Sequence, residues 1–219
     1  MAKRAQEKER RRLARLEAER AAEKAAARKR TMQIASGALL AIVAIGAIVV
    51  VATAGGGGSD SKASASQVAT DAKAAGCAYK TYKSEGRTHT AKKVTYKTNP
   101  PTSGPHNPVP AQDGIYDAGN SPAKEAFVHS LEHGRIEFQY KPGSSAGDVA
   151  KLRRLAESKF DGTAGYHTLM FENDTNMPEQ FAATAWTRSI TCAKLTPQAL
   201  TAMESFRNAF TDKGPEFIP

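Results

Sequence analysis

The sequence has few of the residues and motifs that mark redox, repeat or serine-hydrolase proteins. It contains only two cysteines, Cys77 and Cys192, and their wide separation excludes a CxxC redox motif. No internal repeat is present, and the length leaves room for one modest domain. Ser103 near His106 does not indicate a serine hydrolase, because the chain has no G-x-S-x-G motif and no assignable acid.

Charge is absent from residues 32–54. As a helix with about 1.5 Å per residue, this run spans about 34 Å, enough for a bilayer core of about 30 Å. Arg28, Lys29 and Arg30 precede the run, whereas residues 55–59 after it carry no positive charge. By the positive-inside rule we predict a single-pass protein of the cell membrane, with its N-terminus cytoplasmic and its C-terminal domain extracytoplasmic.

The alternative for this apolar run is a cleaved secretory signal. Ala52-Thr53-Ala54 has the small-residue form that signal peptidase accepts, but the run exceeds the usual about 7–15 apolar residues. We therefore favour an uncleaved transmembrane helix in contact with the lipid bilayer. In either case both cysteines are exported to an oxidising compartment, and a disulfide between Cys77 and Cys192 is the simplest pairing.

The net charge of +9 belongs mainly to the N-terminal tail. Residues 1–30 contain 12 Lys or Arg and 5 Glu, whereas the other 189 residues have 19 basic and 17 acidic groups. Because the domain is nearly balanced, no nucleic-acid partner is expected. Residues 1–31 are predicted to be a helical or disordered cytoplasmic tail, which either contacts anionic lipid through its Arg clusters or acts only as a topology signal.

The exported part consists of a linker and one globular domain. Residues 55–66 are mostly Gly, Ser and Ala, typical of a flexible linker, so the domain is expected to span residues 67–219. Residue patterns predict strands at 94–96, 136–140, 166–171 and 182–190, and helices that begin at Ser121, Val149 and Thr196 and end near Gly134, Gly162 and Gly214. The order β-α-β-α-β-β-α predicts a small α+β domain. The strand at 136–140 alternates apolar and polar residues, as expected for a half-buried strand.

The sequence His129-Ser130-Leu131-Glu132-His133 has a spacing that suits metal binding. Residues i and i+4 share one face of a helix, so His129 and His133 could bind the same ion, with Glu132 close by. The string matches the H-x-x-E-H pattern of inverted zinc proteases, in which the glutamate is the general base. Gly134 is predicted to end the helix directly after it, and no third-ligand helix is evident.

Two further histidines could complete such a site. His106 lies in a proline-stiffened loop at 99–108, and His89 precedes the first predicted strand. Imidazole suits both zinc and copper, so His89, His106, His129 and His133 are candidate ligands for either metal. His167 with Met170 is a further candidate copper pair, although we expect Met170 and Met177 to fill the core. The alternative for each histidine is a hydrogen-bonded, partly buried imidazole.

The chain resembles a bacterial family catalogued as domain of unknown function 3105. The resemblance covers about residues 76–217 and rests on motifs in the family's order: Pro100 to His106, Gly114-Ile115-Tyr116, Val128 to Arg135, Ala183 to Trp186, Cys192 and Gly214-Pro215-Glu216. The layout of tail, anchor and exported domain is similar to actinobacterial members. The resemblance implies that the family's characteristic residues here are polar groups and one indole: His89, Ser103, His106, Tyr116, His129, Glu132, His133 and Trp186.

These observations lead to three functional hypotheses. The first is a membrane-anchored extracytoplasmic module whose four candidate histidines bind a polar group or a transition metal, zinc or copper. The second is a metal-dependent envelope hydrolase with Glu132 as its base. The third is a non-catalytic scaffold or interaction protein in which these residues only organise the fold.

Overall fold

The computed structural model describes residues 63–216 and 218. The predicted tail at 1–31, the transmembrane helix at 32–54 and most of the linker lie outside the described residues. None of the described helices combines the length and the apolarity that a membrane crossing requires.

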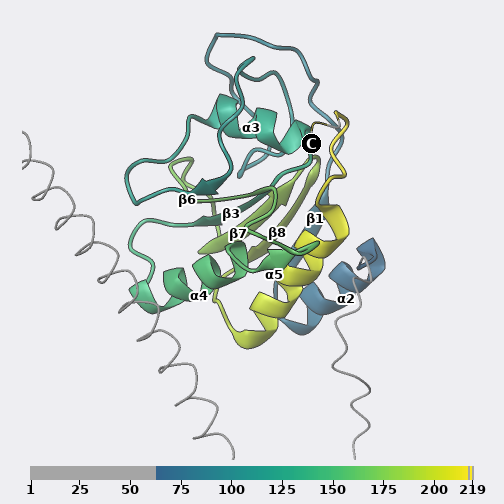
Figure 1. The fold of residues 1–219 in the computed structure, drawn as a ribbon, viewed down its shortest axis with the longest axis vertical. Helices are drawn as coiled ribbons and strands as arrows, with labels where there is room; N and C mark the ends of the chain where they lie inside the picture. The colour runs from purple at the N-terminus through teal and green to yellow at the C-terminus, as the bar shows by residue number, and fades with distance from the viewer. Residues whose placement is uncertain (1–62, 217, 219) are drawn as a thin grey trace, which may run out of the picture. The chain divides into compact units, whose positions relative to one another are not determined.

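A mixed six-stranded sheet organises the domain (Figure 1). Its strands lie in the order β1, β8, β7, β3, β6, β2, with bounds Ala78–Thr81, Arg188–Cys192, Phe181–Ala185, Ile136–Tyr140, Thr168–Glu172 and Gly114–Ile115. The pairs β3–β6 and β6–β2 are parallel, and the other neighbours are antiparallel. A separate small ladder pairs β4 (Lys159–Phe160) with β5 (Thr163–Ala164). The predicted α+β class is confirmed.

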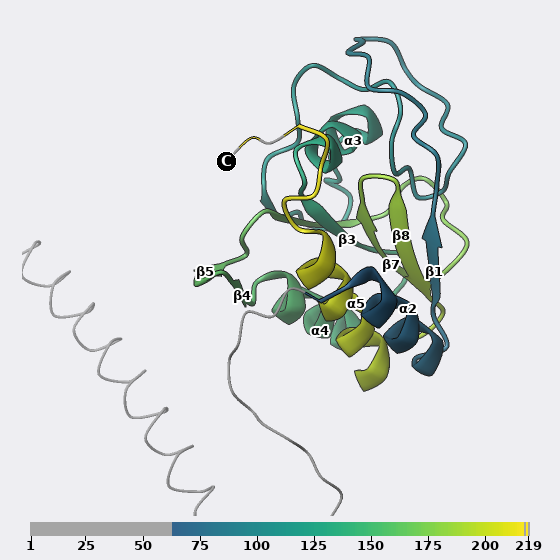
Figure 2. The same ribbon diagram turned by 90° about the vertical axis from the view of Figure 1, so that its right-hand side faces the viewer.

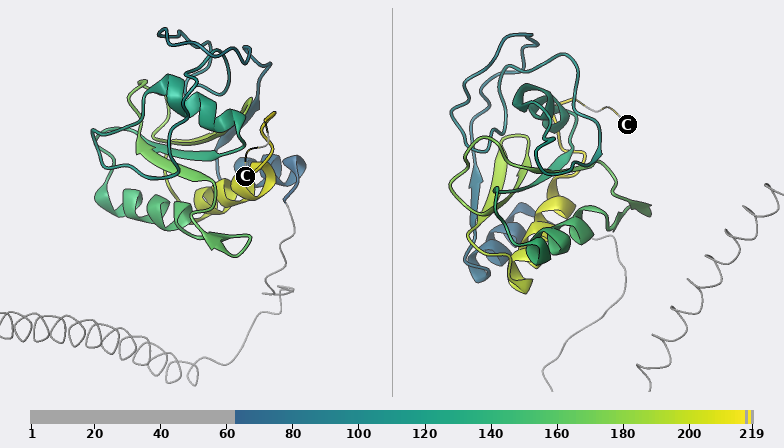
Figure 3. Two further views of the ribbon diagram at one scale, coloured as in Figure 1. Left: turned by 45° about the horizontal axis from the view of Figure 1, so that its top comes forward. Right: turned by 90° about the vertical axis from the view of Figure 1, so that its left-hand side faces the viewer.

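The helices lie on opposite faces of this sheet. Three of them, α2 (Ala65–Ala74), α4 (Ala146–Ala156) and α5 (Pro197–Phe210), cover one face (Figure 2). The fourth described helix, α3 (Lys124–Glu132), covers the other face together with the long segment 82–113 (Figures 1 and 3). The sheet is therefore covered on both sides, with an irregular segment forming much of one cover.

The face under α2, α4 and α5 holds the main hydrophobic core. The predicted start of α5 is confirmed, because the Thr196 hydroxyl accepts a hydrogen bond from the Ala199 amide and Pro197 occupies the first turn. Met203, Phe206 and Phe210 then point from one side of the helix into this core. The core meets α2, α4 and the alternate apolar residues of β3.

Strand β3 is buried on both faces, which corrects the prediction of a half-buried strand. Ile136 and Phe138 face the main core, whereas Glu137 and Gln139 lie under α3 and are fully buried as well. Internal hydrogen bonds satisfy part of the polar pair: Gln139 Nε2 donates to Glu137 Oε2 at 3.1 Å, and Thr184 Oγ1 donates to the same oxygen at 2.8 Å, whereas Glu137 Oε1 has no partner among the described residues. The alternation of apolar and polar residues along β3 thus directs apolar side chains to the main core and polar side chains to the buried space under α3.

Two predicted strands are wrong. Residues 94–96 form no strand, because the Val94 amide donates to the Glu125 carboxylate on α3 at 2.9 Å instead of to a strand neighbour. The single strand predicted at 182–190 is the hairpin of β7 and β8. Its turn contains Thr187 at φ 59°, a left-handed conformation that threonine seldom adopts, so the sequence carried no turn signal there.

Helix boundaries also differ from expectation. Helix α2 was not predicted: it begins at Ala65, with Ser64 capping it, so the expected domain start at Gln67 falls inside it. Helix α3 begins at Lys124 rather than after Ser121, whose hydroxyl instead donates to the Glu172 carbonyl. Helix α4 ends at Ala156, because the β4–β5 ladder follows it.

The predicted disulfide is confirmed. Cys77 and Cys192 are bonded, with their Cα atoms 4.5 Å apart. Cys77 directly precedes β1 and Cys192 ends β8, so the bond reinforces the antiparallel pair at this edge of the sheet.

Candidate metal centre

Two loop segments meet above α3 and bring two histidines together. The His106 amide donates to the Thr88 carbonyl at 3.0 Å, and the Thr90 amide donates to the His106 carbonyl at 2.7 Å. These two bonds form an isolated parallel bridge between His89 and His106. Their imidazole centroids are consequently 5.0 Å apart, although 16 residues separate them along the chain.

Helix α3 supplies the remaining groups, and the loop is attached to it. The Asn107 amide donates to the Glu125 carbonyl at 3.0 Å. His129 and Glu132 are both buried on the last turns of α3. The predicted end of the helix is confirmed, since Gly134 follows at φ 81°, a conformation that favours glycine.

Backbone carbonyls orient the two buried imidazoles. His106 Nδ1 lies 2.8 Å from the Gly104 carbonyl oxygen, and His129 Nδ1 lies 2.6 Å from the Asn107 carbonyl oxygen. A carbonyl only accepts, so each Nδ1 carries the proton and each Nε2 presents a lone pair. This arrangement is typical of metal-binding histidines, where the hydrogen bond at one ring nitrogen fixes the other toward the ion.

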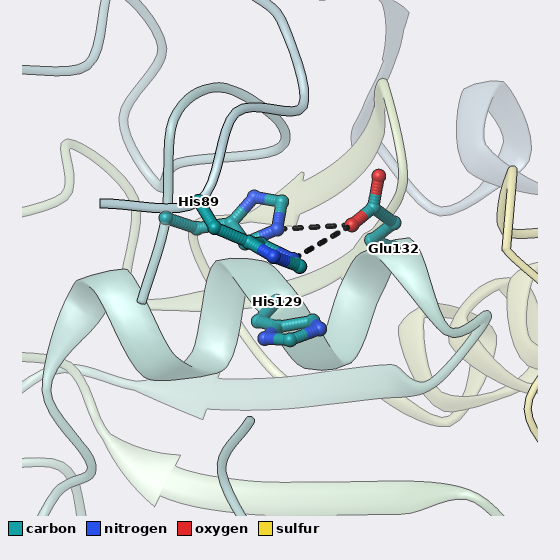
Figure 4. A group of neighbouring side chains, drawn as sticks. His89, His129 and Glu132 are labelled. Carbon is teal, nitrogen blue, oxygen red and sulfur yellow. Dashed lines mark ion pairs between the residues drawn. The ribbon is translucent and has the colours of Figure 1, made fainter. Parts of the chain in front are cut away.

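Four side chains converge as the inner set, which comprises His89, His106, His129 and Glu132. One ligand atom from each lies within 4.8 Å of the others. Figure 4 shows His89 above α3 and the Glu132 carboxylate directed toward the imidazoles, with His129 below. The sequence placed Glu132 near the candidate ligands, and the geometry makes it a ligand candidate itself.

The contact between His106 and Glu132 lacks a hydrogen-bond donor. His106 Nε2 is 2.9 Å from Glu132 Oε2, yet this nitrogen has no donor to bond. With Nδ1 protonated, Nε2 and an ionised carboxylate oxygen are two acceptors facing each other. His106 is fully buried and Glu132 is 3% exposed, so a proton or a metal cation must lie between the two atoms.

Burial favours uncharged imidazoles in this set. Desolvation lowers the pKa of His106 and of His129 below the ordinary value, more than their carbonyl partners raise it. Desolvation also raises the pKa of Glu132, although Arg87, with Nε 3.5 Å from Oε1, counteracts part of that change. Neutral imidazoles are the form that binds metal, so protons compete weakly for these nitrogens near neutral pH.

A second group, the outer set, comprises His129, His133 and Glu216. Their ligand atoms also lie within 4.8 Å of one another. His133 Nε2 is 3.7 Å from Glu216 Oε2, and the rings of His129 and His133 are 4.4 Å apart. Burial, followed by the proximity of His129, lowers the pKa of His133 to about 4. His129 is therefore common to both sets, and His133 belongs to the outer one.

A surface opening lies beside both sets. It is lined by Arg87, His89, Glu132, Pro215 and Glu216. The His89 side chain is 50% exposed and that of Glu216 is 45% exposed. Solvent thus reaches the inner set on its His89 side and the outer set on its Glu216 side.

The other characteristic residues of the family resemblance lie around the cluster rather than in it. Trp186 is buried with its ring centroid 6.2 Å from that of His106, edge to face. Ser103 is buried and its hydroxyl accepts from the Glu85 amide at 3.0 Å. The Tyr116 hydroxyl donates to the Gln112 carbonyl at 2.7 Å. Trp186 and Tyr116 thus belong to a second, smaller apolar cluster beside α3, and Ser103 supports the loop.

His167 and Met170 are not neighbours in a copper site. Met170 is buried in the main core. Met177 is also buried, outside that core. Both agree with the expected packing role. His167 Nδ1 lies 2.6 Å from Asp212 Oδ1 instead. This contact holds the segment after α5, which leads to Glu216.

Sequence reasoning missed Arg87 and Glu216. Arg87 pairs with Glu132 and also donates to the Pro215 carbonyl at 3.3 Å. Glu216 reaches the cluster from the far end of the domain, and its amide donates to the Glu132 carbonyl at 3.1 Å. The one available signal was that Gly214-Pro215-Glu216 is part of the family resemblance.

The fold and the site define a small α+β domain with a histidine and glutamate cluster between α3 and a long loop. Residues 87–216 match the family described as "Protein of unknown function (DUF3105)", and the chain belongs to this family. The matched range contains every member of both sets. No curated protein and no solved structure matches the chain.

Proposed function

We propose that this chain is a membrane-anchored extracytoplasmic protein whose domain binds one divalent transition-metal ion at the inner set. The observation that carries the proposal is the buried lone pair of His106 Nε2, which lies 2.9 Å from Glu132 Oε2 and has no hydrogen-bond donor. A metal ion satisfies both acceptors at once, in place of the proton that would otherwise lie between them. The carbonyl bonds at the Nδ1 atoms of His106 and His129 support the same role.

The donor atoms fit zinc or copper. Three imidazole nitrogens and one carboxylate oxygen form a set that both Zn²⁺ and Cu²⁺ accept. In a tetrahedral site with bonds of about 2.0–2.1 Å, ligand atoms are about 3.3 Å apart. In the inner set the ligand atoms of His106 and Glu132 are 2.9 Å apart, and all four ligand atoms lie within 4.8 Å of one another. Only small side-chain movements are therefore needed to reach tetrahedral spacing.

A binding role is better supported than the hydrolase alternative. A hydrolytic centre keeps one coordination position open for water, and its base remains unbound to the metal. Here the Glu132 carboxylate points at the His106 nitrogen, where it completes a four-ligand set. We therefore assign Glu132 as a ligand, and a change of this residue separates the two functions experimentally.

Membrane attachment and location belong to the same proposal. The uncharged run at 32–54 and its basic N-terminal flank support a single-pass anchor with the domain outside the cytoplasm. The Cys77–Cys192 disulfide suits an oxidising compartment. We further propose that the Arg-rich tail contacts anionic lipid. Protease added to intact spheroplasts should digest the domain and leave the tail; a protected domain would contradict this orientation.

The test of metal binding is elemental analysis of the full chain, purified in detergent with a histidine-free affinity tag. We expect about one zinc or copper ion per wild-type chain, and none in a His106→Ala, His129→Ala double variant. Glu132→Gln should lower metal affinity by about 10-fold or more, because an amide oxygen is a weaker ligand than a carboxylate.

His167→Asn is the matched control, since His167 lies outside both sets and asparagine tolerates its φ of 45°. The control should retain the full metal content. Absence of metal from the wild type, even after incubation with Zn²⁺ or Cu²⁺, would refute the proposal and leave the scaffold hypothesis. Full metal content in Glu132→Gln, combined with loss of hydrolytic turnover, would instead establish the hydrolase.

A further inference from the structure

The inner and outer sets share one ligand atom. The Asn107 carbonyl holds His129 Nδ1, so His129 offers only Nε2 to either set. A single nitrogen lone pair binds one ion at a time. Occupation of the two sets is consequently mutually exclusive while this ring orientation is kept.

The two sets differ in accessibility and in ligand number. The inner set has four protein ligands, of which His106 and Glu132 are almost completely buried. The outer set has three, and its Glu216 carboxylate is 45% exposed on the surface opening. A site with three protein ligands leaves a position for water and exchanges its ion more readily than a closed one.

Glu216 is held at the site by the backbone around it. Its amide donates to the Glu132 carbonyl at 3.1 Å, and the Asp212 amide donates to the Gly134 carbonyl at 2.9 Å. Gly214 packs so closely that an added Cβ would lie 2.0 Å from the Glu132 carbonyl oxygen. The segment 212–216 is therefore fixed against the end of α3, and Glu216 has a defined place beside His133.

We infer that the outer set is a loading position, through which a metal ion passes between solvent and the inner set by exchange on His129 Nε2. This inference rests on the proposed function, because it presupposes an ion in the inner set. His133 and Glu216 take the hydrated ion at the surface, and His129 is already one of its ligands when the remaining inner residues replace them. Metal–ligand bonds form and break, and the proton that lies between His106 Nε2 and Glu132 Oε2 in the metal-free protein leaves to solvent as the ion enters.

A loading position changes rates without changing the final state. Losing even a group that orients a ligand weakens metal binding by about 10–100-fold. Removal of the Glu216 carboxylate should thus slow both uptake and release by at least about tenfold. Since both rates fall by the same factor, the affinity of the inner set for the ion should not change.

The experiment uses Co²⁺ as a visible probe with the metal-free full chain in detergent. Stopped-flow absorption measures uptake, and mixing of the loaded protein with EDTA measures release. Glu216→Gln preserves the shape of the side chain and the backbone bond to Glu132, and His133→Ala tests the second outer ligand. Glu157→Gln, which removes an exposed carboxylate from α4's end, is the matched control.

We expect one Co²⁺ per chain and the same final spectrum in all four proteins, with slow uptake and release in the two outer-set variants only. Rates within about twofold of wild type in both variants would overturn the inference while the metal-binding function stands. Two ions per wild-type chain, or loss of the ion from Glu216→Gln at equilibrium, would also overturn it. A wild type that binds no Co²⁺, Zn²⁺ or Cu²⁺ would remove both proposals.

Discussion

The two sides of the sheet differ in what they bury. Under α2, α4 and α5 the side chains are mainly apolar, with Arg207 as a buried exception, and aromatic residues such as Phe206 and Phe210 pack edge to face at 5.0 Å. Under α3 and the loop, apolar residues share the space with Glu137, Gln139 and His106, all fully buried. Burying polar groups costs free energy unless they find partners. The first side therefore contributes most of the free energy of folding, and the polar groups of the second side lower it.

The largest expected effect comes from the apolar side. Phe206→Ala should lower the free energy of unfolding by about 3–5 kcal/mol, because it removes a fully buried ring and leaves a cavity. Chemical denaturation followed by circular dichroism measures this loss. Val109→Ala, at a position that is 65% exposed, should change little. A loss below about 1 kcal/mol for Phe206→Ala would mean that this side does not dominate stability.

The next effect, stabilisation by bound metal, is expected only from the polar side of the sheet. Zn²⁺ at about 100 times its dissociation constant should raise the free energy of unfolding by about 2.7 kcal/mol. His106→Gln should abolish this increment, whereas Phe206→Ala should retain it, because distant changes add. Parallel denaturation curves with Zn²⁺ and with EDTA provide the measurement. An equal increment in His106→Gln would place the metal elsewhere.

The third effect, the smallest over any one pH unit, concerns Glu137. Burial raises its pKa well above the ordinary value, so the folded protein keeps a proton that the unfolded chain loses above pH about 4.3. The unfolded state then binds fewer protons, and stability falls as pH rises, by up to about 1.4 kcal/mol per pH unit until the folded pKa is reached.

Glu137→Gln removes this titration and retains the acceptor for Gln139 and Thr184. Its stability relative to wild type should therefore rise from pH 4 to pH 7, measured by denaturation in EDTA so that metal has no influence. Glu157→Gln on the surface serves as the control. A stability difference that stays constant with pH would show that Glu137 titrates alike in both states.

Sequence patterns predicted the helices and strands that neighbouring residues determine, through capping or alternation. Thr196 and Pro197 predicted the start of α5, and the alternation along 136–140 predicted β3. The spacing of His129 and Glu132 placed both on one helix. Elements that depend on distant contacts were missed: α2 begins in the predicted linker and continues where no element was predicted, because its helix is stabilised by burying Val68 and Ala72 against the main core.

The candidate site shows the same limit. The sequence selected all three histidines of the inner set, because clustered imidazoles favour metal chemistry. Their convergence depends on the bridge between His89 and His106, two loop residues without any periodic pattern. Glu216 lies 83 residues beyond His133, and only the packing of segment 212–216 against α3 brings it near.

The Cys77–Cys192 disulfide has a mechanical consequence. A pulling force on the N-terminal side of the domain travels along α2 and reaches Cys77 before it reaches the loop at 82–113. At Cys77 the covalent bond transmits the load into β8, at the end of the β7–β8 hairpin. A load applied at this end of the domain is thus diverted into the sheet, and the loop that holds His89 and His106 experiences little of it.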